Sequence, residues 1–484
     1  MGDIKKSEFS EKEVHEKIKK SKSYSLKDSA AVNATAGFGD TYISPYMIAM
    51  NAQNSQIAAL TSIPNLIAPL AQLFTSKAME KYSRRKIFGI SILIQCLIWI
   101  PIILVSLLFL KNIKAAPLLV VIFWTIYAGF GNFAAPAWSS WIGDLVKKEE
   151  SGRFFGLRNR IGGICALVAM LLGGIILDKF ELLAKITNTQ IWVFAGFAFI
   201  FLLAMTFRFI SRHYVLKQYE PHFKFEKEYY FSFFDFIKKA STNNYGRFSI
   251  YVAFVVLATN IAGPFYAVYM LRTLNFTYTQ FMLVSVVATI STFMFMPIWG
   301  KFTDKFGNIK TLKITGFLIP VVCFLWLLSP KLSWFFYLIL AANFFSGFAW
   351  AGFNLAAGNF VYDAATPQRR SLCVAYSSVL NGLGVFIGAT IGGLLASTLP
   401  TTVFIFHRLM FISLISGVAR YLVSFIMVSK LKEVRNIEAR ASWKDVPFVS
   451  ELYQFNSHLV REFPLIIKTP FKRIRKIRKN NTKL

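Results

Sequence analysis

The chain has 484 residues, of which 55% are hydrophobic and 50 are phenylalanine, a composition too apolar for an ordinary soluble domain. Its formal net charge is +30 at pH 7, yet the basic residues lie between long apolar runs rather than in one continuous segment. The composition therefore excludes a soluble or nucleic-acid-binding protein and predicts a membrane protein whose loop charges set its orientation.

Twelve apolar runs follow in chain order, each near the roughly 20 residues that a helix needs to cross a bilayer core about 30 Å thick. They lie at about residues 28–51, 55–76, 87–110, 117–143, 155–177, 190–211, 248–271, 279–300, 311–329, 333–361, 371–396 and 404–428. We predict an all-α polytopic membrane protein with twelve transmembrane helices in two six-helix bundles.

The polar stretches between and around these runs predict the domain organisation. The longest internal stretch, residues 212–247, indicates a linker between bundles at 28–211 and 248–430, with basic tails at 1–27 and 431–484. Lys and Arg are concentrated in the linker, in both tails and in the loops after the second, fourth, eighth and tenth runs. The positive-inside rule then places those loops and both termini in the cytoplasm, with the spans in the cell membrane.

The two halves of the chain repeat one another. Four matches share an offset of 219 positions, namely Asp144 with Asp363, Gly163 with Gly382, the glycines at 173–174 with those at 392–393, and Pro45 with Pro264. Arg208 in the sixth run matches Arg420 in the twelfth at an offset of 212, as a change in loop length would produce. A common offset across separate helices predicts two six-helix repeats with a pathway between them.

The loops after the second and eighth runs carry a charged motif. The later loop contains Gly300, Asp304, Gly307 and Lys310, and the earlier one has Ser76, Glu80, Ser83 and the basic triplet Arg84, Arg85 and Lys86. Both resemble the G-x-x-x-D-x-x-G-x-[RK]-[RK] loop of the major facilitator superfamily, the earlier copy with serines for its glycines and Glu80 for the aspartate. Glycine permits a tight turn, and a carboxylate is favoured beside a helix N-terminus, which suits a gate.

Two other segments, 138–160 and 264–272, are similar to spans of uncharacterised bacterial and archaeal permeases of that superfamily. The resemblance covers about residues 28–430 and implies the superfamily fold, alternating access and a substrate site between the halves. It thus implies a secondary transporter for a small-molecule substrate, while a non-transporting sensor or scaffold of the same fold remains the alternative. The expected partners are the solute, membrane lipid and protons, with no nucleic acid, and we expect a monomer.

Other mechanisms lack the residues that they need. The sequence has no phosphate-binding Gly-Lys-Ser loop for ATP-driven transport, and no paired acid and base groups within the spans for a membrane enzyme. The four cysteines lie in apolar runs without metal-ligand or disulfide spacing, so we predict no metal, no cofactor and no catalytic residue. No apolar segment precedes about residue 28, so no cleavable signal peptide is expected.

Asp40 is the clearest candidate for chemistry, because an ionisable residue at membrane depth is costly and usually functional. It lies near the middle of the first run, on a helical face shared with Asn33 and Ser44. In apolar surroundings a carboxylate holds a proton more readily, which makes Asp40 a candidate proton carrier. The alternative is a structural carboxylate that is hydrogen-bonded to neighbouring helices.

Polar and aromatic residues of three other runs are candidates for the substrate pathway, although each is also compatible with packing. They are Asn132 and Ser139 in the fourth run, Thr259 and Tyr266 in the seventh, and Asn343, Trp350 and Asn354 in the tenth. Thr259 occupies the place of Asp40 in the second repeat, so any proton site is confined to the first half.

Charged residues at the cytoplasmic ends of the spans are expected to form an inner gate. Besides the motif residues, its ion pairs would involve Asp144, Asp304, Asp363, Arg153, Arg370 and Glu80. Arg208 and Arg420 lie near the same ends and are expected to snorkel towards lipid headgroups instead.

Two further segments allow two interpretations each. Gly384, Gly388 and Gly392 in the eleventh run are predicted to let two helices approach closely, in preference to a similar motif of proton-coupled antiporters. The C-terminal tail adds the basic run 471–479 to scattered apolar residues. This composition is typical of an interfacial helix drawn to anionic lipid, or of a disordered tail.

Overall fold

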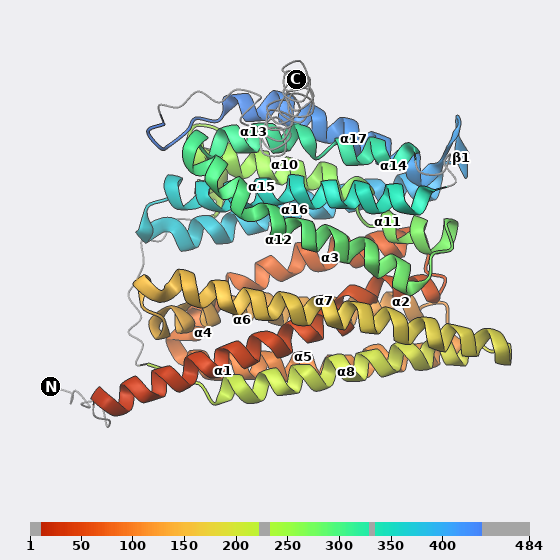
Figure 1. The fold of residues 1–484 in the computed structure, drawn as a ribbon, viewed down its shortest axis with the longest axis horizontal. Helices are drawn as coiled ribbons and strands as arrows, with labels where there is room; N and C mark the ends of the chain where they lie inside the picture. The colour runs from red at the N-terminus through yellow and green to blue at the C-terminus, as the bar shows by residue number, and fades with distance from the viewer. Residues whose placement is uncertain (1–10, 222–232, 329–333, 438–484) are drawn as a thin grey trace, which may run out of the picture.

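Two six-helix bundles lie side by side, with their helices running roughly along the long axis of the molecule and the first half below the second in Figure 1. The computed structural model describes residues 11–221, 233–328 and 334–437, and nearly all of these are helical. The fold is therefore the all-α, twelve-span architecture that the sequence predicts. The segment 438–484, with the basic run of the tail, lies outside the described residues.

The first bundle contains six spans, of which the first is interrupted. Its elements are α1 (Glu11–Phe38), the short turn η1 (Asp40–Tyr42), α2 (Ile43–Ala49), α3 (Asn54–Gln72), α4 (Thr75–Lys81), α5 (Arg84–Leu110), α6 (Ala116–Leu145), α7 (Lys148–Thr187) and α8 (Ile191–Leu216). Helices α1, η1 and α2 together make the first span, and α4 is a short helix between the second and third.

The second bundle repeats this plan, with breaks in its first and third spans. Its elements are α9 (Phe233–Ala240), α10 (Asn244–Ala262), α11 (Phe265–Val268), the π-helical turn η2 (Tyr269–Thr273), α12 (Tyr278–Phe306), α13 (Asn308–Leu318), α14 (Val321–Leu328), α15 (Phe335–Ala364), α16 (Pro367–Thr398), the hairpin β1 (Thr402–Val403) and β2 (Phe406–His407), α17 (Arg408–Met427) and η4 (Val428–Lys430). Helices α10, α11 and η2 form the seventh span, and α13 with α14 forms the ninth.

Ten segments of the described chain are long and apolar enough to cross a membrane, beginning with α5. The remaining two spans, the one formed by α1 and α2 and the one formed by α3, are the more polar ones. The first helix is already formed at Glu11, the first described residue, well before the expected residue 28. The sequence explains this extension, because residues 11–36 contain neither glycine nor proline and nothing stops the helix.

The ends of the spans can be told apart by charge. The loops around α4, between α6 and α7, between α12 and α13 and between α15 and α16 carry the Lys and Arg clusters; we call this the basic end. It lies on the left of Figure 1, and the opposite end, with α2, α11 and β1, lies on the right.

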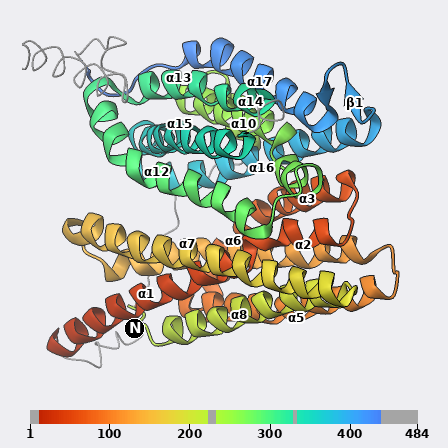
Figure 2. The same cartoon turned by 45° about the vertical axis from the view of Figure 1, so that its right-hand side comes forward.

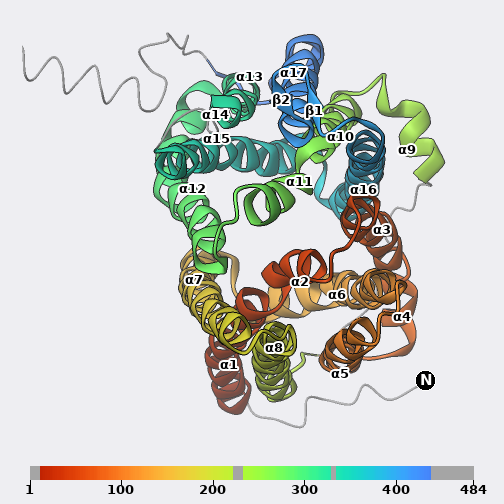
Figure 3. The same cartoon turned by 90° about the vertical axis from the view of Figure 1, so that its right-hand side faces the viewer.

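The halves meet through two pairs of helices, α3 against α16 and α7 against α12. Figure 3 shows α2 and α11 between the two bundles, where they contact each other. Within the second half, α16 packs closely on α10. A Cβ at Gly384, Gly388 or Gly392 would lie within 2.5 Å of a carbonyl oxygen of α10. The packing interpretation of this glycine series is therefore confirmed.

Candidate functional site

The first span is broken at Asp40, the residue that the sequence singles out. Helix α1 ends at Phe38, and Asp40 begins the single turn η1 before α2 continues the span. Gly39 at the break packs closely against α5, because a Cβ there would lie 2.4 Å from the ring of the fully buried Trp99. The predicted polar face of one continuous helix is consequently divided, with Asn33 before the break and Ser44 after it.

Asp40 faces two polar side chains of neighbouring helices. Tyr127 on α6 interacts with its carboxylate by hydrogen bonding, and Arg208 on α8 interacts with it electrostatically. Its Oδ1 atom is buried and has no hydrogen-bond partner in the described part of the chain. A carboxylate left half-satisfied in this way has an unused acceptor for a proton or a ligand donor.

Arg208 corrects one prediction from the sequence, because its side chain does not extend to the lipid surface. The residue is only 6% exposed and donates to the carboxamide oxygen of Gln95 on α5 and, at 3.3 Å, to Ser211 Oγ. Gln95 in turn donates to the Tyr127 carbonyl at 2.9 Å. The Asp40 carboxylate provides a negative charge inside the bundle, and the Arg208 guanidinium interacts with it instead of extending to the lipid headgroups.

Asp28 extends the network towards the basic end and was not singled out from the sequence. It is 3% exposed, and its carboxylate accepts from Ser211 Oγ at 2.7 Å and from Arg158 Nη2 at 3.3 Å. A buried polar chain thus runs from Asp28 through Ser211, Arg208 and Gln95 to the surroundings of Asp40. The sequence signal was the unbroken helical pattern before residue 28, which places Asp28 inside a helix rather than at its start.

The second half has a related arrangement that lacks the carboxylate. Arg420, the counterpart of Arg208, is 5% exposed and donates to Ser416 Oγ at 3.1 Å and to the Thr259 carbonyl at 3.3 Å. The predicted snorkelling is therefore wrong for Arg420 as well. Thr259 stands where the first half has Asp40, so the two arginines lie beside equivalent positions of the broken spans.

The other predicted pathway residues do not form one cluster of contacts. The side chains of Asn33, Asn132, Thr259 and Asn343 each bond to a carbonyl four residues earlier in their own helix. Ser139 and Asn354 are exposed and Ser44 is half-buried. Tyr266 bonds to Ser413 at 2.6 Å and packs with its ring tilted against Trp326, and Trp350 packs on Phe353. Their role in a pathway stays a prediction.

At the basic end of the first half, Arg84 is the centre of the charged cluster. It is 1% exposed, and its guanidinium binds Asp144 and, at 3.0 Å, Ser140. Glu220, which follows α8, accepts from the backbone N–H groups of Arg84 and Arg85 at 2.8 and 3.3 Å and so caps α5.

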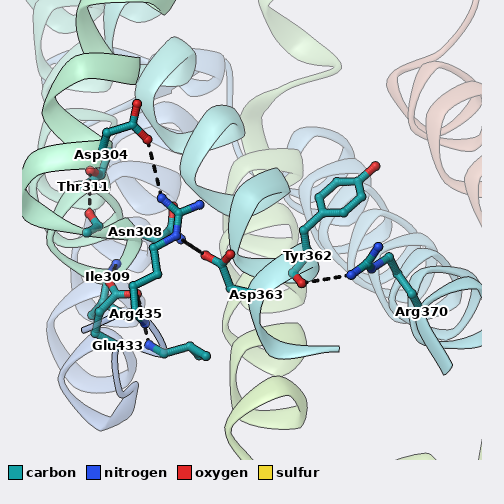
Figure 4. A network of polar contacts seen from close by, with 11 residues as sticks. Asp304, Asn308, Ile309, Thr311, Tyr362, Asp363, Arg370, Glu433 and Arg435 are labelled. Atoms are coloured by element: carbon teal, nitrogen blue, oxygen red, sulfur yellow. Dashed lines mark hydrogen bonds and ion pairs between the residues drawn. The ribbon is translucent and has the colours of Figure 1, made fainter. Parts of the chain in front are cut away.

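The second half builds the same cluster from different residues, drawn in Figure 4. Arg435, which follows α17, binds Asp363 at 2.7 Å and Asp304 at 3.5 Å. The hydrogen bond with Asp363 raises the pKa of Arg435 above its usual range. Glu433 accepts from the Ile309 N–H at 2.9 Å and caps α13, just as Glu220 caps α5.

The predicted gate residues are thus at the basic end, but their partners differ from those expected. Asp144, Asp304 and Asp363 pair with Arg84 and Arg435, within their own half.

The remaining gate residues make no such pairs among the described residues. Arg370 donates to the carbonyls of Tyr362 and Ala365 and lies over the Tyr362 ring. Exposed positions are taken by Glu80, Arg85, Lys86 and Arg153, while Gly300 is half-buried. Gly307 has φ 91°, a backbone conformation that favours glycine.

Hydrogen bonds between the halves lie at the opposite end. Arg272 Nη2 in η2 donates to the Ala52 carbonyl at 2.8 Å, beyond α2. Asp178 on α7 accepts from the first N–H groups of α12, those of Tyr278 and Thr279, at 2.7 and 3.1 Å. Asn54 donates to the Ala396 carbonyl at 3.0 Å. Figures 1 and 2 show the two bundles closest together at this end.

Two six-helix repeats, a broken first span with a buried carboxylate and charged clusters at one end define a multi-pass membrane transporter. The sequence profile described as Major Facilitator Superfamily matches residues 30–245 and 248–482. The chain belongs to this superfamily. No protein of curated function matches its sequence.

Solved structures agree on the fold. The chain is similar to the nucleoside transporter NupG, with a TM-score of 0.61 at 14% identity over 86% of this chain and 100% of that one. It is also similar to a bacterial homologue of the iron transporter ferroportin in its inward-facing state, with a TM-score of 0.63 at 12% identity over 84% and 98%. The outward-facing state of such a homologue gives a TM-score of 0.55 at the same identity and coverage.

Proposed function

We propose that this chain is a secondary active transporter that moves a small solute across the cell membrane by alternating access, with its basic end and both termini in the cytoplasm. The main support is the distribution of contacts. The opposite end is held shut by Arg272, Asp178 and Asn54, which bond across the halves. At the basic end, the charged clusters hold residues of their own half together.

This distribution is what an inward-facing state requires, since the two halves separate at one end while they stay joined at the other. The higher TM-score with the inward-facing ferroportin homologue agrees with this assignment. Nucleosides and iron are the solutes named for the similar structures, and at 12–14% identity neither selects a substrate for this chain.

Proton coupling through Asp40 is the second part of the proposal. Asp40 is a buried carboxylate with an unused oxygen beside Arg208 and Tyr127. It can either bind a proton or stay ionised and pair with the arginine. The break at Gly39 lets the carboxylate change its surroundings when the first span moves.

The test uses the purified full chain in proteoliposomes, with a solute first identified because it raises the melting temperature of the protein. Asp40→Asn should abolish uphill flux driven by a pH gradient while solute exchange continues. The matched control is Glu181→Gln, which neutralises a carboxylate that pairs with Lys185 within α7. If Asp40→Asn still accumulates solute against a gradient in proportion to the pH difference, the coupling proposal is wrong. If no stabilising solute is transported at all, the chain is a sensor or scaffold.

A further inference from the structure

A cavity of about 180 Å³, open on one side, lies in the first half towards the basic end. Five helices contribute to its wall, which is formed by Asp28, Val32, Phe88, Gly131, Ala135, Trp138, Arg158 and Arg208. This is many times the space that one water molecule needs, so the cavity has room for several waters or for one small polar group.

Three N–H donors of the lining residues lack a hydrogen-bond partner among the described residues. They are Nε of Arg158, Nε of Arg208 and Nε1 of Trp138, and all three are buried. Each belongs to a side chain that borders the cavity. Buried donors are rarely left unpaired in native proteins, which points to an acceptor that completes them.

The charge of the cavity wall also favours an acceptor with negative charge. Arg158 and Arg208 contribute two guanidinium groups, and Asp28 is the one carboxylate among the lining residues. Arg158 also lies 4.5 Å from the Trp138 ring, an arrangement that holds the guanidinium in place. Asp40, which lies deeper in the first span at the start of η1, offsets Arg208 only while it is ionised.

We infer that this cavity binds an oxyanion, the carboxylate or phosphate group of a solute that enters from the basic end. Guanidinium groups and an indole N–H suit the several acceptor positions of an oxyanion. The inference rests on the proposed transport function, because protonation of Asp40 leaves one positive charge in the network for the anion to neutralise. It makes the substrate class an anionic small molecule, carried with a proton.

The experiment measures binding rather than flux, so it can fail while the transport proposal stands. Inorganic phosphate and succinate are titrated into the purified full chain at constant ionic strength, and binding is followed by calorimetry and by the melting temperature. Glycerol is the uncharged control. Wild-type protein should bind at least one of the two anions and should not bind glycerol.

Substitutions of different lining residues should change the affinity for the anion in opposite directions. Trp138→Phe keeps the ring and loses its donor, and Arg158→Lys keeps the charge and loses Nε, so each should weaken anion binding about tenfold. Asp28→Asn removes the repelling charge and should strengthen it several-fold. The matched control Arg212→Lys changes a basic residue of the same helix as Arg208 that bonds to the Gly89 carbonyl, outside the cavity wall, and should leave affinity unchanged.

Two results would overturn the inference. One is that neither anion binds the wild-type protein, or that both bind with equal affinity to wild type, Trp138→Phe and Arg158→Lys. The other concerns the source of the anion and comes from nanodiscs. If phosphatidylglycerol stabilises the protein relative to phosphatidylcholine through Arg158 and Trp138, and soluble anions do not compete, the cavity holds a lipid headgroup rather than a solute. A transported neutral solute in a protein that binds neither anion would retain the proposed function and reject this inference.

Discussion

At the scale of single residues, buried charge pairs explain what the sequence pattern did not. Position near the end of an apolar run suggested that Arg208 and Arg420 reach the lipid headgroups, and both are 6% exposed or less. Besides a serine of its own helix, each arginine bonds to a residue of another helix, Gln95 or Thr259, that is far away in sequence, and a local pattern carries no signal for such a partner. Asp40 was predictable because it interrupts an apolar run by itself, whereas its partners Tyr127 and Arg208 were not.

The first prediction concerns Arg208. Its replacement by Met removes the cation from a network that contains Asp28 and Asp40, and an uncompensated buried carboxylate is costly. We expect a loss of about 3 kcal/mol in stability, seen as a clearly lower melting temperature in detergent. Arg212→Met removes a half-buried arginine that makes one bond to a backbone carbonyl, and should cost about 1 kcal/mol. Equal losses in the two variants would argue against the buried network.

At the scale of helices, a hydropathy pattern does not detect the interruptions of the first and seventh spans. The apolar runs predicted the existence and order of the spans because a membrane helix needs a fixed length of apolar sequence. The breaks at Gly39 and near Gly263 leave that length unchanged, so the runs look continuous. The close packing of Trp99 against Gly39 at the first break is a contact between distant parts of the sequence, which a hydropathy pattern does not contain.

The second prediction tests this close approach. Gly39→Ala places a Cβ against the fully buried Trp99 ring, and overpacking of this kind costs about 1–3 kcal/mol. The matched control is Gly129→Ala in α6, where nothing lies within 4 Å of the added Cβ. This control should be neutral or slightly stabilising, because alanine favours a helix over glycine. A melting temperature that falls equally in both variants would show that the contact with Trp99 is unimportant.

The third prediction concerns the caps that follow the last helix of each half. Glu220→Ala and Glu433→Ala each leave the first N–H groups of a helix without an acceptor, at α5 and α13 respectively. We expect each to lower stability by about 1 kcal/mol in thermal unfolding. Glu16→Ala, an exposed residue paired with Lys20, should change it by less than about 0.5 kcal/mol. A cap variant no different from this control would reject the structural role of that glutamate.

At the scale of the whole molecule, hydrogen bonds join the two halves at the opposite end. The repeat in the sequence, with its offset of 219, predicted the two bundles, because equivalent residues occupy equivalent helices. It could not predict which end is closed, since one sequence would serve both states of the transport cycle that we propose. The contacts of Asp178, Arg272 and Asn54 carry that information.

The fourth prediction is that Asp178→Ala opens the opposite end. The variant loses two hydrogen bonds to the first turn of α12, which are charge-assisted and hold the halves together. We expect the ratio of outward-facing to inward-facing molecules to rise about tenfold or more. Glu181→Ala, which removes a pair internal to α7, should leave the ratio unchanged.

The most direct test of alternating access measures both ends of the protein at once by double electron–electron resonance. One spin-label pair replaces the exposed residues Thr187 and Thr398 at the opposite end, and the other replaces Lys147 and Lys301 at the basic end. Both pairs are placed in a background without the four native cysteines. When a stabilising solute is added, or when Asp178→Ala is introduced, the distance at one end should lengthen as the distance at the other shortens. Distances that stay fixed at both ends, or that change in the same direction, would contradict the account.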